Sequence, residues 1–95
     1  MLLGELQLRS LIVQTKKVEY RWFELGIALG IPIEKLERIH DKHSDSPVKA
    51  LVRVYRYWLA AKNGLIPTWK KLIYALQYID EYSLSASIAN MMVSL

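Results

Sequence analysis

The sequence S-P-V-K-A-L-V-R-V-Y-R-Y-W-L, residues 46–59, predicts the best-defined helix of the chain. A serine such as Ser46 can accept a hydrogen bond from a free backbone N–H of the first turn, and proline suits the first helical position because no partner is needed there. We therefore expect a helix from about Pro47 to Lys62 that ends before Asn63-Gly64. Its apolar residues recur at helical spacing and form one wide stripe of Val48, Leu51, Val52, Tyr55, Trp58 and Leu59.

On both sides of this helix apolar residues again recur at helical spacing, and no stretch alternates apolar and polar residues as a half-buried strand would. Five further helices are expected, at about residues 5–16, 19–29, 33–42, 68–79 and 84–93. Gly30 is expected to cap the end of the second helix and Thr68 the start of the fifth. Short connections favour antiparallel neighbours, so the sequence predicts an all-α, antiparallel six-helix bundle that fills residues 1–95 as one domain.

The predicted core lies on the apolar side of each helix. The second helix is expected to be the most deeply buried, because its other flank, with Tyr20, Phe23 and Ile27, is apolar as well. The last helix is expected to turn Leu84, Ile88, Met91 and Leu95 inward. The main core residues are expected to be Trp22, Leu25, Leu29, Leu51, Tyr55, Trp58, Trp69, Leu72 and Leu76.

Three tryptophans lie in distinctive local sequences: Trp22 in W-F-E-L-G-I-A-L-G-I, Trp58 in Y-R-Y-W-L and Trp69 in P-T-W-K-K-L-I-Y-A-L. In this order and at this spacing they resemble the death domain of the death-fold superfamily, over residues 5–95. The R-x-D-L-L signature of the death-effector branch is absent from the last helix, which has the sequence L-S-A-S-I-A-N-M-M. The resemblance implies a six-helix antiparallel Greek-key bundle without enzymatic activity.

The same resemblance implies what such a bundle does. Death domains associate with other death folds, homotypically or heterotypically, and so assemble cytoplasmic signalling platforms in apoptosis, inflammation or innate immunity. One recurrent contact joins helices one and four of one molecule to helices two and three of the next. Contacts of this asymmetric kind build open oligomers when they repeat.

The composition excludes several other classes of protein. A hydrophobic fraction of 53% over 95 residues excludes a disordered chain, and the absence of cysteine excludes a disulfide scaffold, a zinc finger and a thiol nucleophile. No apolar run is long enough for a signal peptide or a membrane span, so neither membrane insertion nor secretion is expected. Because Met1 stands directly at the first expected helix, we also expect the chain to have been cut from a longer protein.

Few residues form a pattern that carries chemistry. His40-x-x-His43, flanked by Asp41 and Asp45, could face a metal from one side of a helix, but the motif lacks a third ligand at a fixed spacing. None of the serines lies in a G-x-S-x-G or S-x-x-K motif, and the four glycines are too dispersed to cradle a phosphate. We expect no catalytic residue, metal, cofactor or small-molecule substrate.

Charge is the more informative feature. Residues 34–71 hold nine Lys or Arg and four Asp or Glu, a local net charge of +5, against −1 for the rest of the chain. At 100° per residue, Lys49, Arg53 and Arg56 fall within about 60° on the fourth helix and form a basic strip. Glu34, Glu37 and Asp41 likewise form an acidic strip on the third helix. They are either the two sides of the contact that the resemblance implies, or solvated faces, the acidic one pairing locally with Arg38.

Two alternatives remain open at this stage. Cations beside tyrosines, which are common binding anchors, suggest a second interface with Tyr57, Lys70, Lys71, Tyr74 and Tyr78, although the rings could equally cover neighbouring helices. The basic segment and a helix-turn-helix-like step also suggest a small nucleic-acid-binding domain. Against that function, Glu34, Glu37 and Asp41 would repel phosphates, so nucleic acid is the second choice of partner.

Overall fold

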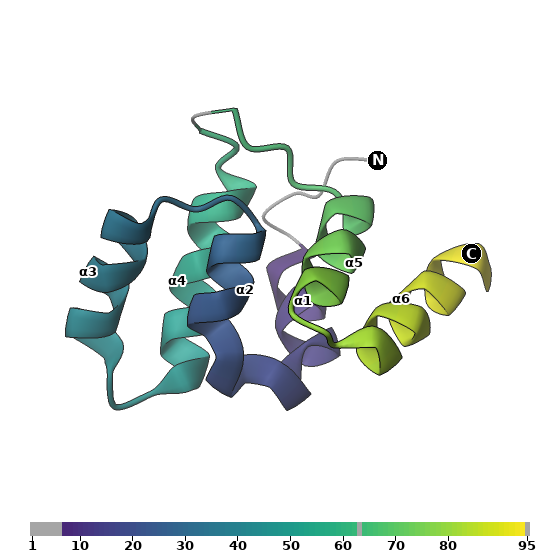
Figure 1. Cartoon of the computed structure of the whole chain (residues 1–95), viewed down its shortest axis with the longest axis horizontal. Helices are drawn as coiled ribbons and strands as arrows, with labels where there is room; N and C mark the ends of the chain where they lie inside the picture. Colours follow the sequence, from purple (N-terminus) through teal and green to yellow (C-terminus); the bar gives the residue numbers. More distant parts are fainter. Residues whose placement is uncertain (1–6, 63, 95) are drawn as a thin grey trace.

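We describe residues 7–62 and 64–94 of the chain from a computed structural model (Figure 1). These residues form six α-helices and one 3-10 helix, so the expected all-α class is confirmed. The elements are α1 (Leu8–Gln14), the 3-10 helix η2 (Lys16–Arg21), α2 (Trp22–Ala28), α3 (Ile33–His43), α4 (Pro47–Leu59), α5 (Trp69–Tyr78) and α6 (Tyr82–Ser94). From α1 to α5, successive α-helices run in alternating directions. Within the described ranges, no helix is both long and apolar enough to cross a bilayer.

Helix α4 contributes more buried residues than any other described helix, and it contacts α1, η2, α2 and α3. Ser46 caps it as expected, since its Oγ accepts a hydrogen bond of 3.3 Å from the Lys49 backbone N–H. Five of its side chains are at most 1% exposed: Ala50, Leu51, Val54, Tyr55 and Trp58. One side of a single helix therefore supplies the centre of the core.

The second helix is buried mainly on one side. Trp22 and Leu25 lie in the core, on the side of α2 that α3, α4 and α5 cover. On the second apolar flank Tyr20 is 68% and Ile27 45% exposed, whereas Phe23 is half-buried against the core and lies edge-on to Trp22. Of the expected second flank, only Phe23 therefore packs on the core.

The connection between α1 and α2 is helical, which the sequence did not indicate. Val18 has φ −115° and ψ 18°, which lies outside helical geometry and breaks the 3-10 segment η2. Helix α2 therefore begins at Trp22, three residues later than expected. The six expected helices keep their order, with η2 inserted after the first.

Arg21, at the end of η2, is held by three acceptors. Its Nη1 donates hydrogen bonds to the Ile79 carbonyl oxygen at 2.8 Å and to Glu81 Oε1 at 2.7 Å. Its Nη2 donates to Glu24 Oε2. The bonds to Ile79 and Glu81 tie η2 to the turn between α5 and α6, about sixty residues further along the chain. The bonds to Glu24 and Glu81 raise the pKa of Arg21, and the bond from Arg21 lowers the pKa of Glu24, since each group is stabilised in its charged form.

Left-handed residues end three of the helices. Gly30, at φ 93°, ends the second helix as expected, and the Ile31 N–H then donates to the Gly26 carbonyl at 3.0 Å. Asp80, at φ 65°, ends α5 in the same way. Helix α4 stops at Leu59 instead of Lys62, because Ala61 adopts a left-handed φ of 56°. Asn63, the first residue of the expected Asn63-Gly64 stop, lies outside the described residues.

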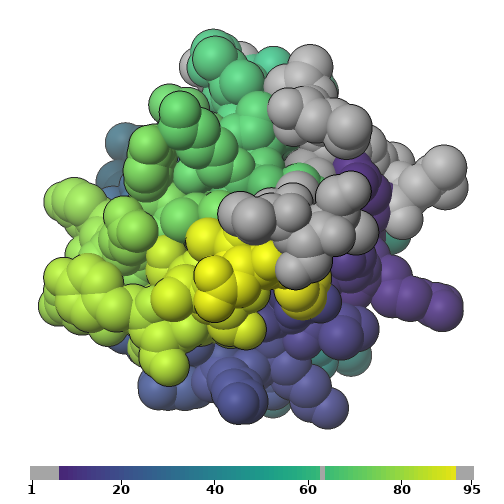
Figure 2. Space-filling model, turned by 90° about the vertical axis from the view of Figure 1, so that its right-hand side faces the viewer, coloured from purple at the N-terminus to yellow at the C-terminus, as the bar shows by residue number. Residues whose placement is uncertain are grey.

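Helices α5 and α6 begin at or near the positions expected from the sequence. Thr68 caps α5 as expected, since its Oγ1 accepts a hydrogen bond of 3.1 Å from the Lys71 N–H. Helix α6 begins at Tyr82, two residues earlier than expected. Of its expected inward residues, Ile88 is buried and Leu84 half-buried, whereas Met91 is 38% exposed; Leu95 lies outside the described residues. Within these residues α6 packs mainly on α5, and Figure 2 shows the two together on one face of the molecule.

A buried polar contact joins α1 to α4. The Thr15 hydroxyl donates to the Leu11 carbonyl at 2.7 Å, and the Tyr55 hydroxyl lies 2.8 Å from Thr15 Oγ1. Because Thr15 has one hydroxyl hydrogen and gives it to Leu11, Tyr55 must be the donor in the second bond. Burial raises the pKa of Tyr55, which keeps this donor protonated.

The expected core residues occupy two different environments. Trp69 is half-buried at the edge of the core, because it stands at the exposed start of α5. The other eight are buried: Trp22, Leu25, Leu29, Leu51, Tyr55, Trp58, Leu72 and Leu76.

We expect Trp58→Ala to lower the free energy of unfolding by about 3–5 kcal/mol, since it removes a large buried side chain and leaves a cavity. Trp69→Ala removes the same atoms from a half-buried position and should cost clearly less. Urea denaturation followed by circular dichroism measures both. Equal losses in the two variants, or an unchanged midpoint for Trp58→Ala, would contradict this packing.

We expect Arg21→Ala to lower the thermal midpoint, because the turn between α5 and α6 loses its link to η2. Arg9→Ala, at an exposed position of α1, is the matched control and should leave the midpoint unchanged. The pKa of Glu24 is depressed in the folded protein, so its stabilisation is present above the ordinary Glu value of about 4.3 and is lost as the pH falls. The difference in thermal midpoint between wild type and Arg21→Ala should therefore become smaller in acid. If the two thermal midpoints differ by the same amount at pH 7 and in acid, the Arg21–Glu24 bond contributes nothing to the stability of the fold.

Candidate interaction surface

The acidic strip of Glu34, Glu37 and Asp41 is exposed along α3, and its members point away from the buried Leu36 and Ile39. Asp41 Oδ1 lies 4.0 Å from His40 Nδ1, and no salt bridge joins the strip to Arg38 among residues 7–62 and 64–94. The local pairing with Arg38 is therefore not found. The three carboxylates are exposed along one side of α3.

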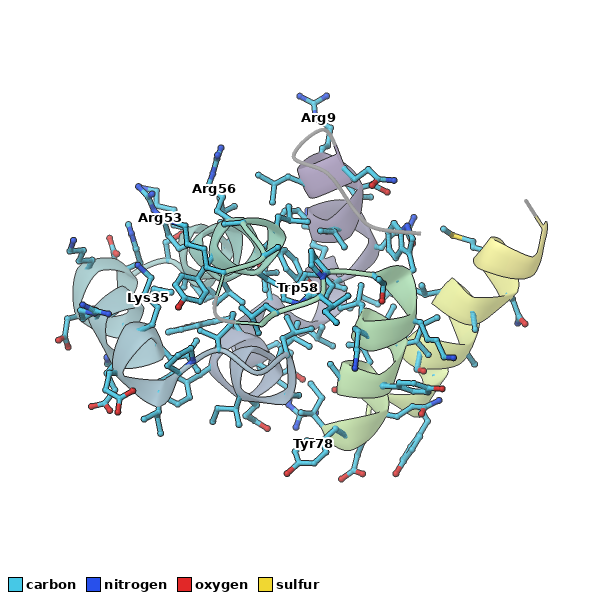
Figure 3. All side chains as sticks on the ribbon, turned by 90° about the horizontal axis from the view of Figure 1, so that it is seen from above. Arg9, Lys35, Arg53, Arg56, Trp58 and Tyr78 are labelled. Carbon is cyan, nitrogen blue, oxygen red and sulfur yellow. The ribbon has the colours of Figure 1, made fainter. Side chains whose placement is uncertain are left out.

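The basic strip of Lys49, Arg53 and Arg56 is exposed on α4. Figure 3 shows Arg53 and Arg56 on the same side of the molecule as Arg9 of α1. Since α1 contacts α4, the three guanidinium groups extend to the same side of this helix pair, which we call the basic face. Sequence reasoning missed Arg9, because no pattern along α1 indicates that it lies beside α4.

A groove between α3 and α4 extends this basic face. One hollow, of about 260 Å³, is lined by Lys35, Arg38, Ile39, Lys42, His43 and Arg53. The next, of about 380 Å³, is lined by His43, Lys49, Val52, Arg53 and Arg56. The two hollows share His43 and Arg53, and no carboxylate lines either of them.

The cations of α3 in this groove were not singled out from the sequence. Lys35, Arg38 and Lys42 stand at i, i+3 and i+7, which places them within about 60° of one another on the helix. The same analysis of helical spacing that identified the two strips would also have identified these three cations. Helix α3 thus carries a basic side toward α4 and an acidic side about 100° further around its axis.

Lys35, Arg38, Lys42, Lys49 and Arg53 of the groove form no salt bridge with another described residue. In the part of the chain that the structure describes, the salt bridges are Arg21–Glu24, Arg21–Glu81 and His40–Asp41. Lys35 lies instead with its Nζ 5.5 Å from the centre of the Tyr57 ring, a cation–π contact. Unneutralised charges of one sign in a hollow attract anions from solution.

The second predicted interface is only partly assembled. Tyr74 and Tyr78 of α5 are 53% and 76% exposed, and the Lys70 Nζ lies 5.8 Å from the centre of the Tyr74 ring. Lys71 is exposed and lines a hollow of about 320 Å³ with both tyrosines. Tyr57 does not belong to this group, because it is half-buried against the core and faces Lys35 of α3. The α5 cluster lies away from the basic face, since Tyr78 and Arg53 point to opposite sides (Figure 3).

The two histidines occupy separate environments. The His40 ring stacks on Trp22, with 6.3 Å between ring centres, and His43 lines the groove. Among the described residues, no three His, Asp or Glu side chains converge as a metal site would require.

Comparison with known proteins adds no assignment: no family model, curated protein or solved structure matches this chain significantly.

Proposed function

We propose that this chain is a non-enzymatic protein-interaction domain of the death-domain type, which associates with further copies of itself and with other death folds. The observation that carries the proposal is the presence of two exposed faces of opposite charge on one small domain. The acidic strip lies on α3, whereas the basic strip of α4 continues to Arg9 on α1. A second copy of the chain therefore offers each face its complement.

The arrangement favours head-to-tail association. Complementary patches at different places on one molecule make a heterologous contact, which leaves a free patch at each end and can be repeated. The pairing of a face on α1 and α4 with a face on α3 agrees with the contact that the tryptophan motifs imply. A Greek-key order of the six helices and a role in cytoplasmic signalling, in apoptosis, inflammation or innate immunity, belong to the same proposal.

A nucleic-acid-binding domain is the second candidate. The cations that line the groove between α3 and α4 favour it, because phosphate groups are their natural partners. The acidic strip on α3 opposes it, since a long phosphate backbone crossing this helix would meet carboxylates. Protein association uses both faces, and nucleic-acid binding uses only one.

Reversing one charge should abolish self-association. In Arg53→Glu a carboxylate would face the acidic strip of the neighbouring molecule, so sedimentation velocity should find monomer where wild type forms larger species. Wild-type association should also weaken with salt, because the Debye length is about 8 Å at 0.15 M and shortens further. The thermal midpoint should stay near that of wild type, since exposed charges contribute little to folding.

The compensating pair and a matched control make this test specific. A mixture of Arg53→Glu and Glu37→Arg proteins should recover association, because opposite signs face each other again. Lys16→Glu carries the same change of charge at an exposed position of η2 and should associate like wild type. Full association of Arg53→Glu, independent of salt, would exclude this interface and turn attention to Tyr74 and Tyr78.

A further inference from the structure

We infer that the groove between α3 and α4 is a binding site for a compact polyphosphate, a small molecule that carries several phosphate groups close together. The site is centred on the hollow of about 260 Å³, into which Lys35, Arg38 and Lys42 of α3 and Arg53 of α4 converge. Lys49 and Arg56 continue it into the adjoining hollow. The first hollow shares only Arg53 with the proposed association surface, whereas the adjoining hollow also contains Lys49 and Arg56 of the basic strip.

The composition of the lining selects the ligand's charge. Four cations line the first hollow and no carboxylate does. Lys35, Arg38, Lys42 and Arg53 make no salt bridge with any described residue, so their charges are available to a ligand. Guanidinium groups bind phosphate oxygens with two parallel hydrogen bonds, and Arg38 of α3 and Arg53 of α4 both line the hollow.

The shape of the lining selects the ligand's size. Cations from two helices meet around one hollow, so one small scaffold with several phosphates can contact both walls together. The Tyr57 ring, 5.5 Å from Lys35 Nζ, holds that ammonium at the wall. Ile39 contributes an apolar surface to the hollow and no competing acceptor from its side chain.

The neighbouring acidic strip disfavours an extended polyanion. It lies about 100° around α3 from the groove cations. A nucleic-acid duplex broad enough to span α3 would bring phosphates toward Glu34, Glu37 and Asp41, whereas a compact ligand stays on the α4 side. The shared chemistry is therefore a cluster of phosphates on a small scaffold, either free in solution or as a lipid headgroup.

Calorimetric titration with inositol hexakisphosphate tests the site directly. Wild type should bind it, more weakly as salt rises. The double variant Arg38→Gln, Lys42→Gln should bind at least about tenfold more weakly, because each charge-assisted contact contributes substantially. The matched control Lys70→Gln, Lys71→Gln, with the same loss of charge on α5, should bind like wild type. Arg38→Lys, which keeps the charge but loses the paired geometry, should fall between wild type and the double variant.

Two further arms identify the source and the class of ligand. Co-sedimentation with phosphatidylcholine vesicles, with and without phosphatidylinositol bisphosphate, separates a lipid headgroup from a free ligand, and either source supports the site. Tighter binding of duplex DNA than of inositol hexakisphosphate at equal salt would overturn the inference in favour of nucleic acid. Equal losses of affinity for inositol hexakisphosphate in the groove and α5 variants would also overturn the inference, because binding would then depend on net charge alone.

Because Arg38 and Lys42 lie outside the basic strip, this inference and the proposed function fail separately. Loss of polyphosphate binding with intact self-association in the double variant assigns the two activities to different residues. Self-association that is unaffected by Arg53→Glu, with polyphosphate binding that depends on Arg38, would leave the groove site standing alone.

Discussion

The burial of one side of α4 is the interaction on which the rest of this structure depends. Ala50, Leu51, Val54, Tyr55 and Trp58 take that side out of solvent almost completely, and α1, η2, α2 and α3 pack around it. The remaining side of the same helix must be polar, and there the chain places Lys49, Arg53 and Arg56. The core and the basic face are thus two consequences of one amphipathic sequence.

The sequence predicts local features well, where a few neighbouring residues determine the geometry. The Ser46 and Thr68 caps and the left-handed Gly30 are found in the structure because each depends on backbone groups within the adjacent turn. Longer-range features are different. The 3-10 helix η2 is stabilised by Arg21 bonds to a turn about sixty residues away, and no local pattern contains that information.

The candidate surfaces also combine features that spacing along one helix predicts with features that depend on contacts between helices. Spacing along α3 and α4 places the acidic and basic strips on the helix faces where the structure has them exposed. It does not indicate that Arg9 joins the basic face, or that Tyr57 is covered by the packing of α3 on α4. The basic side of α3 could have been read from the spacing of Lys35, Arg38 and Lys42. Its meaning emerges only from the structure, in which Arg53 of α4 lines the same hollow.

The central claim is that the basic face of one molecule meets the acidic strip of another, and site-directed disulfide cross-linking tests it most directly. The chain has no cysteine, so only introduced thiols can react. Mixed Arg53→Cys and Glu37→Cys proteins should form a disulfide-linked pair faster than a control mixture of Tyr78→Cys and Glu37→Cys, and high salt should remove the difference. Equal rates in the two mixtures at low salt would contradict the claim.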